Sequence, residues 1–165
     1  MAANESAAVA ACKTYVEAQD IYRRTDWEGE GVREYAQGLR GEHSLFEKTY
    51  GAGDLVLIDA AFANAEGLPG DAQPKAGYVF KVLTAQGPSA AGGRRSYLTS
   101  DRTGQHLTEG FALAACPASW DGTGRNTFLI NQTGVVYQKD LGPETPELFK
   151  KMTEYDPDKT WVMPE

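Results

Sequence analysis

Long apolar runs and an excess of basic residues are both missing from this chain of 165 residues. No stretch of about 18 consecutive apolar residues occurs, so the sequence predicts no membrane-spanning helix. Lysine and arginine number 16 and aspartate and glutamate number 23, which gives a net charge of −7. Because an acidic surface repels the phosphate backbone of DNA and RNA, we expect no nucleic-acid partner.

Histidine and cysteine, which often carry catalysis or bind transition metals, occur only twice each. His43 and His106 lie in polar, glycine-flanked stretches, "GEHS" and "GQHL", and the chain has no G-x-S-x-G, H-E-x-x-H or P-loop pattern. We therefore expect that the protein is not an enzyme. An enzyme would need a fold that gathers one of these histidines with carboxylates.

The two cysteines, Cys12 and Cys116, are too far apart in sequence to form a metal-binding pair. Free cysteine is among the most buried residue types, so two buried thiols are the expected state. A disulfide that joins the first helix to a later strand is the alternative if the compartment is oxidising.

Apolar residues recur at a spacing of three and four between residues 4 and 24, which predicts a helix with Asn4 as its N-cap. The apolar stripe consists of Ala8, Ala11, Cys12, Tyr15, Ala18 and Tyr22. A second amphipathic helix is predicted over roughly residues 53–66. A third, short helix is predicted to begin at Pro143 or Pro146, because proline suits the first turn of a helix.

Strand signals begin at residue 76, where β-branched and aromatic residues become frequent. They occur in "GYVFKVLTA", in "EGFALAACPA", and in "NTFLINQTGVVYQKDL", where "NQTG" predicts a hairpin turn. Consecutive strands with short connections favour an antiparallel sheet, and a preceding helix packs on one of its faces. We therefore expect a single α+β domain over residues 1–165: a helix at 4–24, loops and short helices at 25–75, an antiparallel sheet at 76–142 and a C-terminal tail at 143–165.

The helix "ANESAAVAACKTYVEAQDIYRR" followed by such a sheet resembles type IV pilins and type II secretion pseudopilins. The segments "KVLTAQG" and "GVVYQKDLG", within residues 76–142, resemble the DUF2950 family of uncharacterised bacterial envelope proteins. The resemblance implies a long N-terminal helix packed on an antiparallel sheet, on the periplasmic or extracellular side of the cell envelope. It also implies protein partners or self-assembly through that helix, and membrane attachment only through a hydrophobic segment absent from this sequence. It leaves open a Cys12–Cys116 pairing.

Four acids, Asp26, Glu28, Glu30 and Glu34, surround two glycines in "TDWEGEGVREY". Acids at alternate positions followed by glycine resemble the first half of a calcium loop, because calcium needs several converging carboxylate oxygens. Gln37 stands where such a loop carries its bidentate glutamate, so a solvated acidic loop is the alternative reading.

The sequence thus favours a non-enzymatic soluble domain of a pilin- or pseudopilin-like envelope protein with a role in assembly or interaction. A calcium- or small-ligand-binding module on the same scaffold is the alternative, and the sequence suggests no cofactor other than calcium.

Overall fold

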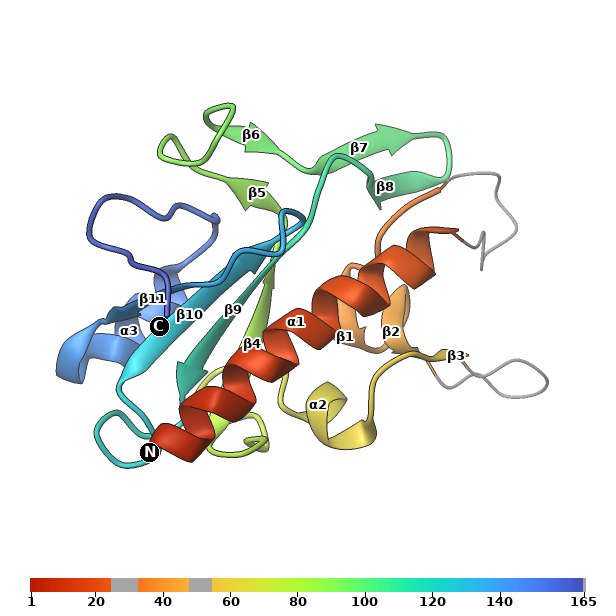
Figure 1. Ribbon diagram of the computed structural model, residues 1–165. Helices are drawn as coiled ribbons and strands as arrows, with labels where there is room; N and C mark the ends of the chain where they lie inside the picture. Colours follow the sequence, from red (N-terminus) through yellow and green to blue (C-terminus); the bar gives the residue numbers. More distant parts are fainter. Residues whose placement is uncertain (25–32, 48–54, 165) are drawn as a thin grey trace.

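A computed structural model describes residues 1–24, 33–47 and 55–164. The chain begins with the 23-residue helix α1 (Ala2–Arg24). Three short strands and a one-turn helix follow: β1 (Gly38–Arg40), β2 (Ser44–Glu47), β3 (Leu55–Val56) and α2 (Ala60–Asn64). The other strands are β4 (Tyr78–Leu83), β5 (Ala85–Gln86), β6 (Arg95–Ser96), β7 (Leu98–Asp101), β8 (Gly104–Leu107), β9 (Ala112–Pro117), β10 (Asn126–Asn131) and β11 (Tyr137–Asp140). A 3-10 turn, η1 (Gly142–Glu144), leads into α3 (Thr145–Lys151) (Figure 1).

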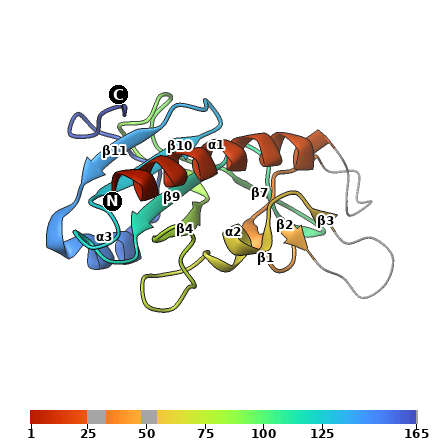
Figure 2. The same ribbon diagram turned by 60° about the horizontal axis from the view of Figure 1, so that its bottom comes forward.

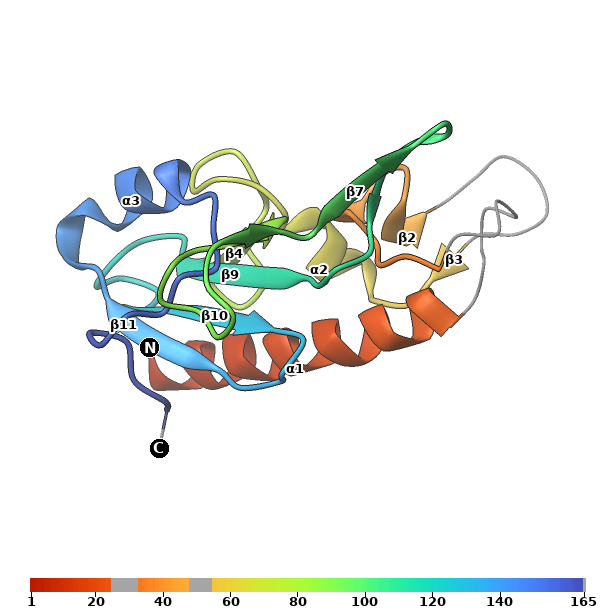
Figure 3. The ribbon, with the colours of Figure 1, turned by 90° about the horizontal axis from the view of Figure 1, so that it is seen from above.

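The main sheet has the strand order β11-β10-β9-β4, and all its pairs are antiparallel. Helices α1 and α3 lie on opposite faces of this sheet (Figure 3). These features confirm the α+β class and the packing of an N-terminal helix on an antiparallel sheet. Among the described residues, no helix is both long and apolar enough to cross a membrane.

Helix α1 runs the length of the molecule, beside β9 and β10 near its start and towards β2 near its end (Figure 2). Its predicted apolar stripe is buried, with Gln19 added to it. Helix α1 begins at Ala2, so Asn4 is inside the first turn and the prediction that it caps the helix is wrong. The Asn4 side-chain amide instead donates to the carbonyl oxygen of Thr123 at 3.0 Å, which ties the start of α1 to the turn before β10.

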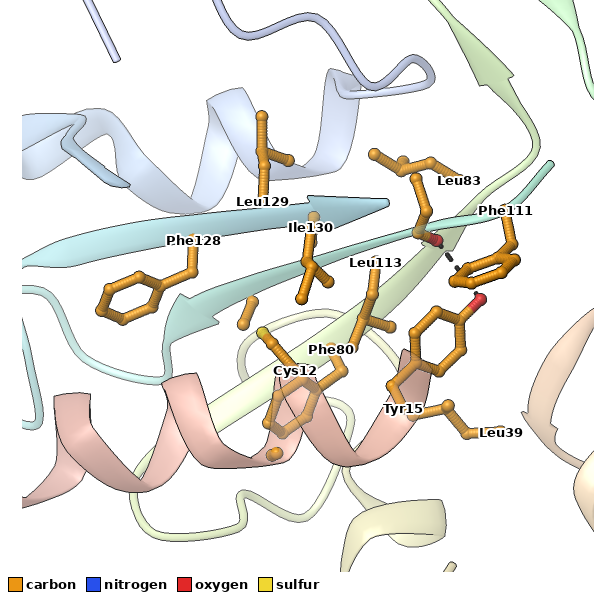
Figure 4. Packing of buried hydrophobic residues seen from close by; sticks show 14 of the residues in the cluster. Cys12, Tyr15, Leu39, Phe80, Leu83, Phe111, Leu113, Phe128, Leu129 and Ile130 are labelled. Atoms are coloured by element: carbon orange, nitrogen blue, oxygen red, sulfur yellow. Dashed lines mark hydrogen bonds between the residues drawn. The ribbon is translucent and has the colours of Figure 1, made fainter. Parts of the chain in front are cut away.

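The core between α1 and the sheet is built by cross-strand alignment. Ala115 of β9 lies opposite Phe80 of β4 and Phe128 of β10, so the two rings flank a small side chain. Cys12 and Tyr15 of α1 pack against this face of the sheet (Figure 4). The small side chain of Ala115 lets the helix backbone approach closely at this point, while the flanking rings fill the space.

Both cysteines are buried free thiols. Cys116 follows Ala115 on β9, so its side chain points to the opposite face of the sheet from that of Ala115. Its cross-strand partner, Val79, points to the same face as Cys116. On that face the Lys81 ammonium donates to carbonyl oxygens at the end of α3, whereas Cys12 lies on the α1 face. The sheet therefore separates the two thiols, and burial raises the pKa of each to about 12.

The segment between α1 and β4 differs from its prediction of loops and short helices. Strands β1, β2 and β3 form a small sheet of their own, and the helix expected over 53–66 is reduced to α2. Asp59 caps α2 by accepting a hydrogen bond from the Phe62 amide at 2.7 Å, so the helix begins only after it. Leu55 and Val56 pair with β2 instead, and strands this short carry too little periodicity to be recognised in sequence.

Thr127 on β10 supports a test of the packing. It is fully buried, and its hydroxyl has no hydrogen-bond partner among the described residues. Thr127→Val exchanges the hydroxyl for a methyl group of similar volume, so we expect it to stabilise the fold by about 1 kcal/mol and raise Tm by a few degrees. Thermal unfolding followed by circular dichroism measures this change. Thr127→Ser, which keeps the hydroxyl and removes the methyl, is the control and should destabilise; a Tm for Thr127→Val below that of the wild type would contradict the expectation.

Candidate functional site

Three of the four predicted calcium ligands, Asp26, Glu28 and Glu30, lie outside the described residues. The fourth, Glu34, is 5% exposed and its Oε2 forms a hydrogen bond with Nδ1 of His106. The next residue, Tyr35, donates its backbone amide to the Leu107 carbonyl oxygen at 2.7 Å. Glu34 is thus held against β8 by a side-chain bond and a neighbouring backbone bond.

His106 lies on β8, in the hairpin that β8 forms with β7. Its Nε2 lies 3.0 Å from Asp101 Oδ1 and 2.6 Å from Thr103 Oγ1. Asp101 also accepts hydrogen bonds from the Thr103 amide at 2.7 Å and from the Thr103 hydroxyl at 2.6 Å. Each ring nitrogen therefore faces a carboxylate: Nδ1 faces Glu34 and Nε2 faces Asp101. An imidazole that is protonated at both nitrogens donates a hydrogen bond to each carboxylate.

The charges of this cluster support one another. Burial lowers the pKa of His106, but its hydrogen bonds with Glu34 and Asp101 outweigh that effect and raise the pKa above the ordinary value. Hydrogen bonds from the Thr103 hydroxyl and amide, with a further contribution from His106, lower the pKa of Asp101 to about 2. The cluster is most stable with a positive ring between two negative carboxylates.

The arrangement of hydroxyl, imidazole and carboxylate resembles the geometry of a nucleophilic triad, but the proton positions differ. In a triad the neutral ring accepts a proton from the hydroxyl. Here the Thr103 hydroxyl donates to Asp101, and the protonated ring has no lone pair with which to accept. A metal is also disfavoured at the ring, because a coordinating imidazole must present a free nitrogen; no metal-binding group of three His, Cys, Asp or Glu side chains occurs in the part of the chain that the structure describes. The geometry makes the cluster an ion-pair link between residue 34 and the β7–β8 hairpin.

No sequence signal pairs Glu34 with His106, because 72 positions separate them. The β7–β8 hairpin itself has a signal in the sequence. "DRTG" places Asp101 and Gly104 at the two ends of a tight turn, and Gly104 has a φ of 124°.

His106 generates a pH prediction. Because folding raises the pKa of His106, the protonated ring stabilises the folded state. This contribution to stability is complete at pH values below the unfolded pKa of about 6.5, and it disappears as the pH rises through the folded pKa. We expect the Tm of the wild type to fall between pH 6 and 9 by a few degrees more than that of His106→Asn, as measured by differential scanning fluorimetry. His43→Asn is the matched control and should follow the wild type. Parallel curves for the wild type and His106→Asn would exclude the stabilising ion pair.

Calcium binding by Asp26, Glu28, Glu30 and Glu34 stays a prediction. We expect calcium at millimolar concentration to raise the Tm of a chelator-treated sample, since a ligand that binds only the native state stabilises it by mass action. The combined substitutions Asp26→Asn, Glu28→Gln and Glu30→Gln should abolish this rise in Tm. The control replaces three exposed glutamates elsewhere in the chain with glutamine, Glu42, Glu109 and Glu144, and should leave the rise in Tm unchanged. An unchanged Tm on addition of calcium to the wild type would rule the site out.

A second candidate region follows the side of α1 that faces the C-terminal tail. Two open hollows of about 370 and 390 Å³ lie there, and both are lined by Val9 of α1 and Pro164 of the tail. The tail is held to the edge strand β11 by a pair of backbone hydrogen bonds between Gln138 and Val162, with N···O distances of 2.6 and 3.0 Å. Val162 and Met163 are 56% and 63% exposed.

A third candidate region is an open hollow of about 770 Å³ beside Tyr137, the first residue of β11. Its lining residues are Ser89, Tyr137, Pro157, Asp158, Lys159 and Thr160. Ser89 belongs to the loop between β5 and β6, whereas residues 157–160 follow α3, so the hollow joins segments that are distant in sequence.

Comparison with known proteins gives a family without an assigned activity. No curated protein and no solved structure matches the chain. A family described as "Protein of unknown function (DUF2950)" matches residues 1–163 through its sequence model, which is nearly the whole chain. The chain therefore belongs to the DUF2950 family.

Proposed function

We propose that the chain is a non-enzymatic domain of a bacterial envelope protein, on the periplasmic or extracellular side, that acts by assembly or by interaction with other proteins. Its architecture would be pilin- or pseudopilin-like. The helix α1, which packs along an antiparallel sheet over much of its length, supports this comparison.

The observation that carries the proposal is the apolar surface beside α1. Exposed large apolar side chains are usually scattered singly on a monomer, so neighbours in one place indicate a contact surface. Val162 and Met163 are adjacent and both more than half exposed, and Met163 and Pro164 line hollows together with Val9 of α1. We call Val9, Val162, Met163 and Pro164 the tail surface.

The backbone of the tail adds a second reason. The pairing of Val162 with Gln138 is a single antiparallel bridge along β11, the edge strand of the main sheet. A sheet edge with exposed apolar side chains beside it can offer backbone groups and side chains to another chain at the same time. The tail surface therefore has the properties of an assembly edge next to the N-terminal helix.

Self-association through the tail surface is testable by sedimentation velocity. We expect the wild type to associate as its concentration rises, and Val162→Ser combined with Met163→Ser to weaken the association by about tenfold, because two exposed apolar side chains leave the contact. Val56→Ser is the control, since Val56 is 50% exposed on β3 and outside the tail surface. A variant that associates as strongly as the wild type, or a wild type that stays monomeric over the whole concentration range, would contradict self-assembly at this surface.

A further inference from the structure

The loop between β5 and β6 is locked from inside by a buried amide. Gln86 is 1% exposed, and its Nε2 donates to the carbonyl oxygens of Ala91 at 2.8 Å and Gly93 at 2.7 Å. Its Oε1 accepts from the Tyr97 hydroxyl at 2.9 Å. A buried amide is costly unless its partners are in place, so these three bonds hold the loop in one conformation.

The same loop is fastened to the segment that follows α3. The Gly87 amide donates to the Tyr155 carbonyl oxygen at 2.9 Å, and the Ser89 amide donates to Asp156 Oδ1 at 2.8 Å. A Cβ atom at residue 87 would lie 2.4 Å from Asp156 Cγ, so only glycine permits this approach. Residues 87–93 and 155–156 thus form one rigid unit, although more than 60 residues separate them in sequence (Figure 1).

This rigid unit forms part of the wall of the hollow of about 770 Å³. Ser89 contributes from the locked loop, Tyr137 from β11, and Pro157 to Thr160 continue directly from the fastened segment. Pockets of about 300–1,000 Å³ accommodate small organic ligands. Loops held this firmly at the surface are typical of preformed binding sites, because a preformed site loses little entropy when its ligand binds.

The polar groups at the rim are also held in place. Asp158 Oδ1 accepts hydrogen bonds from the Thr160 amide at 2.8 Å and from the Thr160 hydroxyl. The Thr160 hydroxyl oxygen in turn accepts from Lys139 Nζ at 2.7 Å. The bonds from Thr160 lower the pKa of Asp158, so it presents an ionised carboxylate at neutral pH. Beside it, Lys159 supplies an exposed ammonium group.

The lining selects among ligand classes. An acyl chain needs an enclosed apolar cavity, and this hollow is open with a charged rim. A divalent cation needs several carboxylates, and Asp158 is the only one in the lining. The Asp158 carboxylate repels a phosphate or a nucleotide, and the nearby ammonium group of Lys139 is already engaged by the Thr160 hydroxyl.

We propose that this hollow is a carbohydrate-binding site that accepts one or two sugar rings. A pyranose presents a C–H face that packs on a flat aromatic side chain, here the ring of Tyr137, and Pro157 adds apolar surface beside it. Its edge carries hydroxyl groups that both donate and accept, which matches the Asp158 carboxylate, the Lys159 ammonium and the Ser89 hydroxyl. The site uses residues different from those of the tail surface, so sugar binding does not depend on self-association.

The test is a titration of the full chain with three soluble oligosaccharides: the tetramers of β-1,4-linked N-acetylglucosamine, β-1,4-linked glucose and α-1,4-linked glucose. Amide shifts in heteronuclear NMR spectra report both the affinity and the location. We expect saturable shifts with at least one probe, centred on residue 89 and residues 158–160. Lys159→Gln and Ser89→Ala should each weaken binding by about threefold to tenfold, because each removes one group from the rim.

The controls separate a site from non-specific contact. Lys13→Gln removes an exposed ammonium group from a different hollow, on α1, and should leave the affinity unchanged. Tyr137→Ala should abolish binding, and the spectra of the same sample show whether the fold is retained. Three results would each overturn the proposal: no saturable shift with any probe up to about 10 mM, which corresponds to negligible affinity; saturable shifts away from the hollow; or equal affinity in the wild type, Lys159→Gln and Ser89→Ala.

Discussion

The fold depends on a central strand that is buried on both faces. All six residues of β9 are buried, and three of them, Ala112, Ala114 and Ala115, are alanines with no exposed surface. Because these side chains are short, α1 can approach one face and α3 the other, while the rings of Phe80 and Phe128 fill the flanks. Larger residues on β9 would push both helices outward, so this strand sets the thickness of the molecule.

Polar side chains hold the periphery to this centre, and several of them join distant segments. Glu5 in the first turn of α1 accepts hydrogen bonds from the amides of Arg125 and Asn126 at 3.0 and 3.1 Å, which fixes the helix to the start of β10. Lys81 donates to the carbonyl oxygens at the end of α3, where the partial negative charge of the helix favours a cation. Glu34 with His106, and Asp156 with the β5–β6 loop, have the same role elsewhere. Such bonds give the loops a definite position, which is the condition for a site on loops.

The sequence predictions succeeded where a pattern was long. The three-and-four spacing of α1 and the strand signals of β4, β9, β10 and β11 reproduce the helix and the main sheet, together with the short helix after Pro143. They failed between α1 and β4, where strands of two to four residues are too short to establish an alternating pattern of apolar and polar residues. The capping role of Asn4 was also wrong, since a polar side chain can serve a distant turn as well as its own helix.

The sequence by itself determined the class of the fold, because the periodicity of apolar residues states which face of each long element must be buried. It also determined that the surface is acidic and that histidine and cysteine are scarce. Only the tertiary structure decided which residues meet: His106 with Glu34 across 72 positions, and the β5–β6 loop with the segment after α3. Side-chain meetings of this kind depend on register and on how layers stack. These are properties of the packed chain as a whole, and no local stretch of sequence contains them.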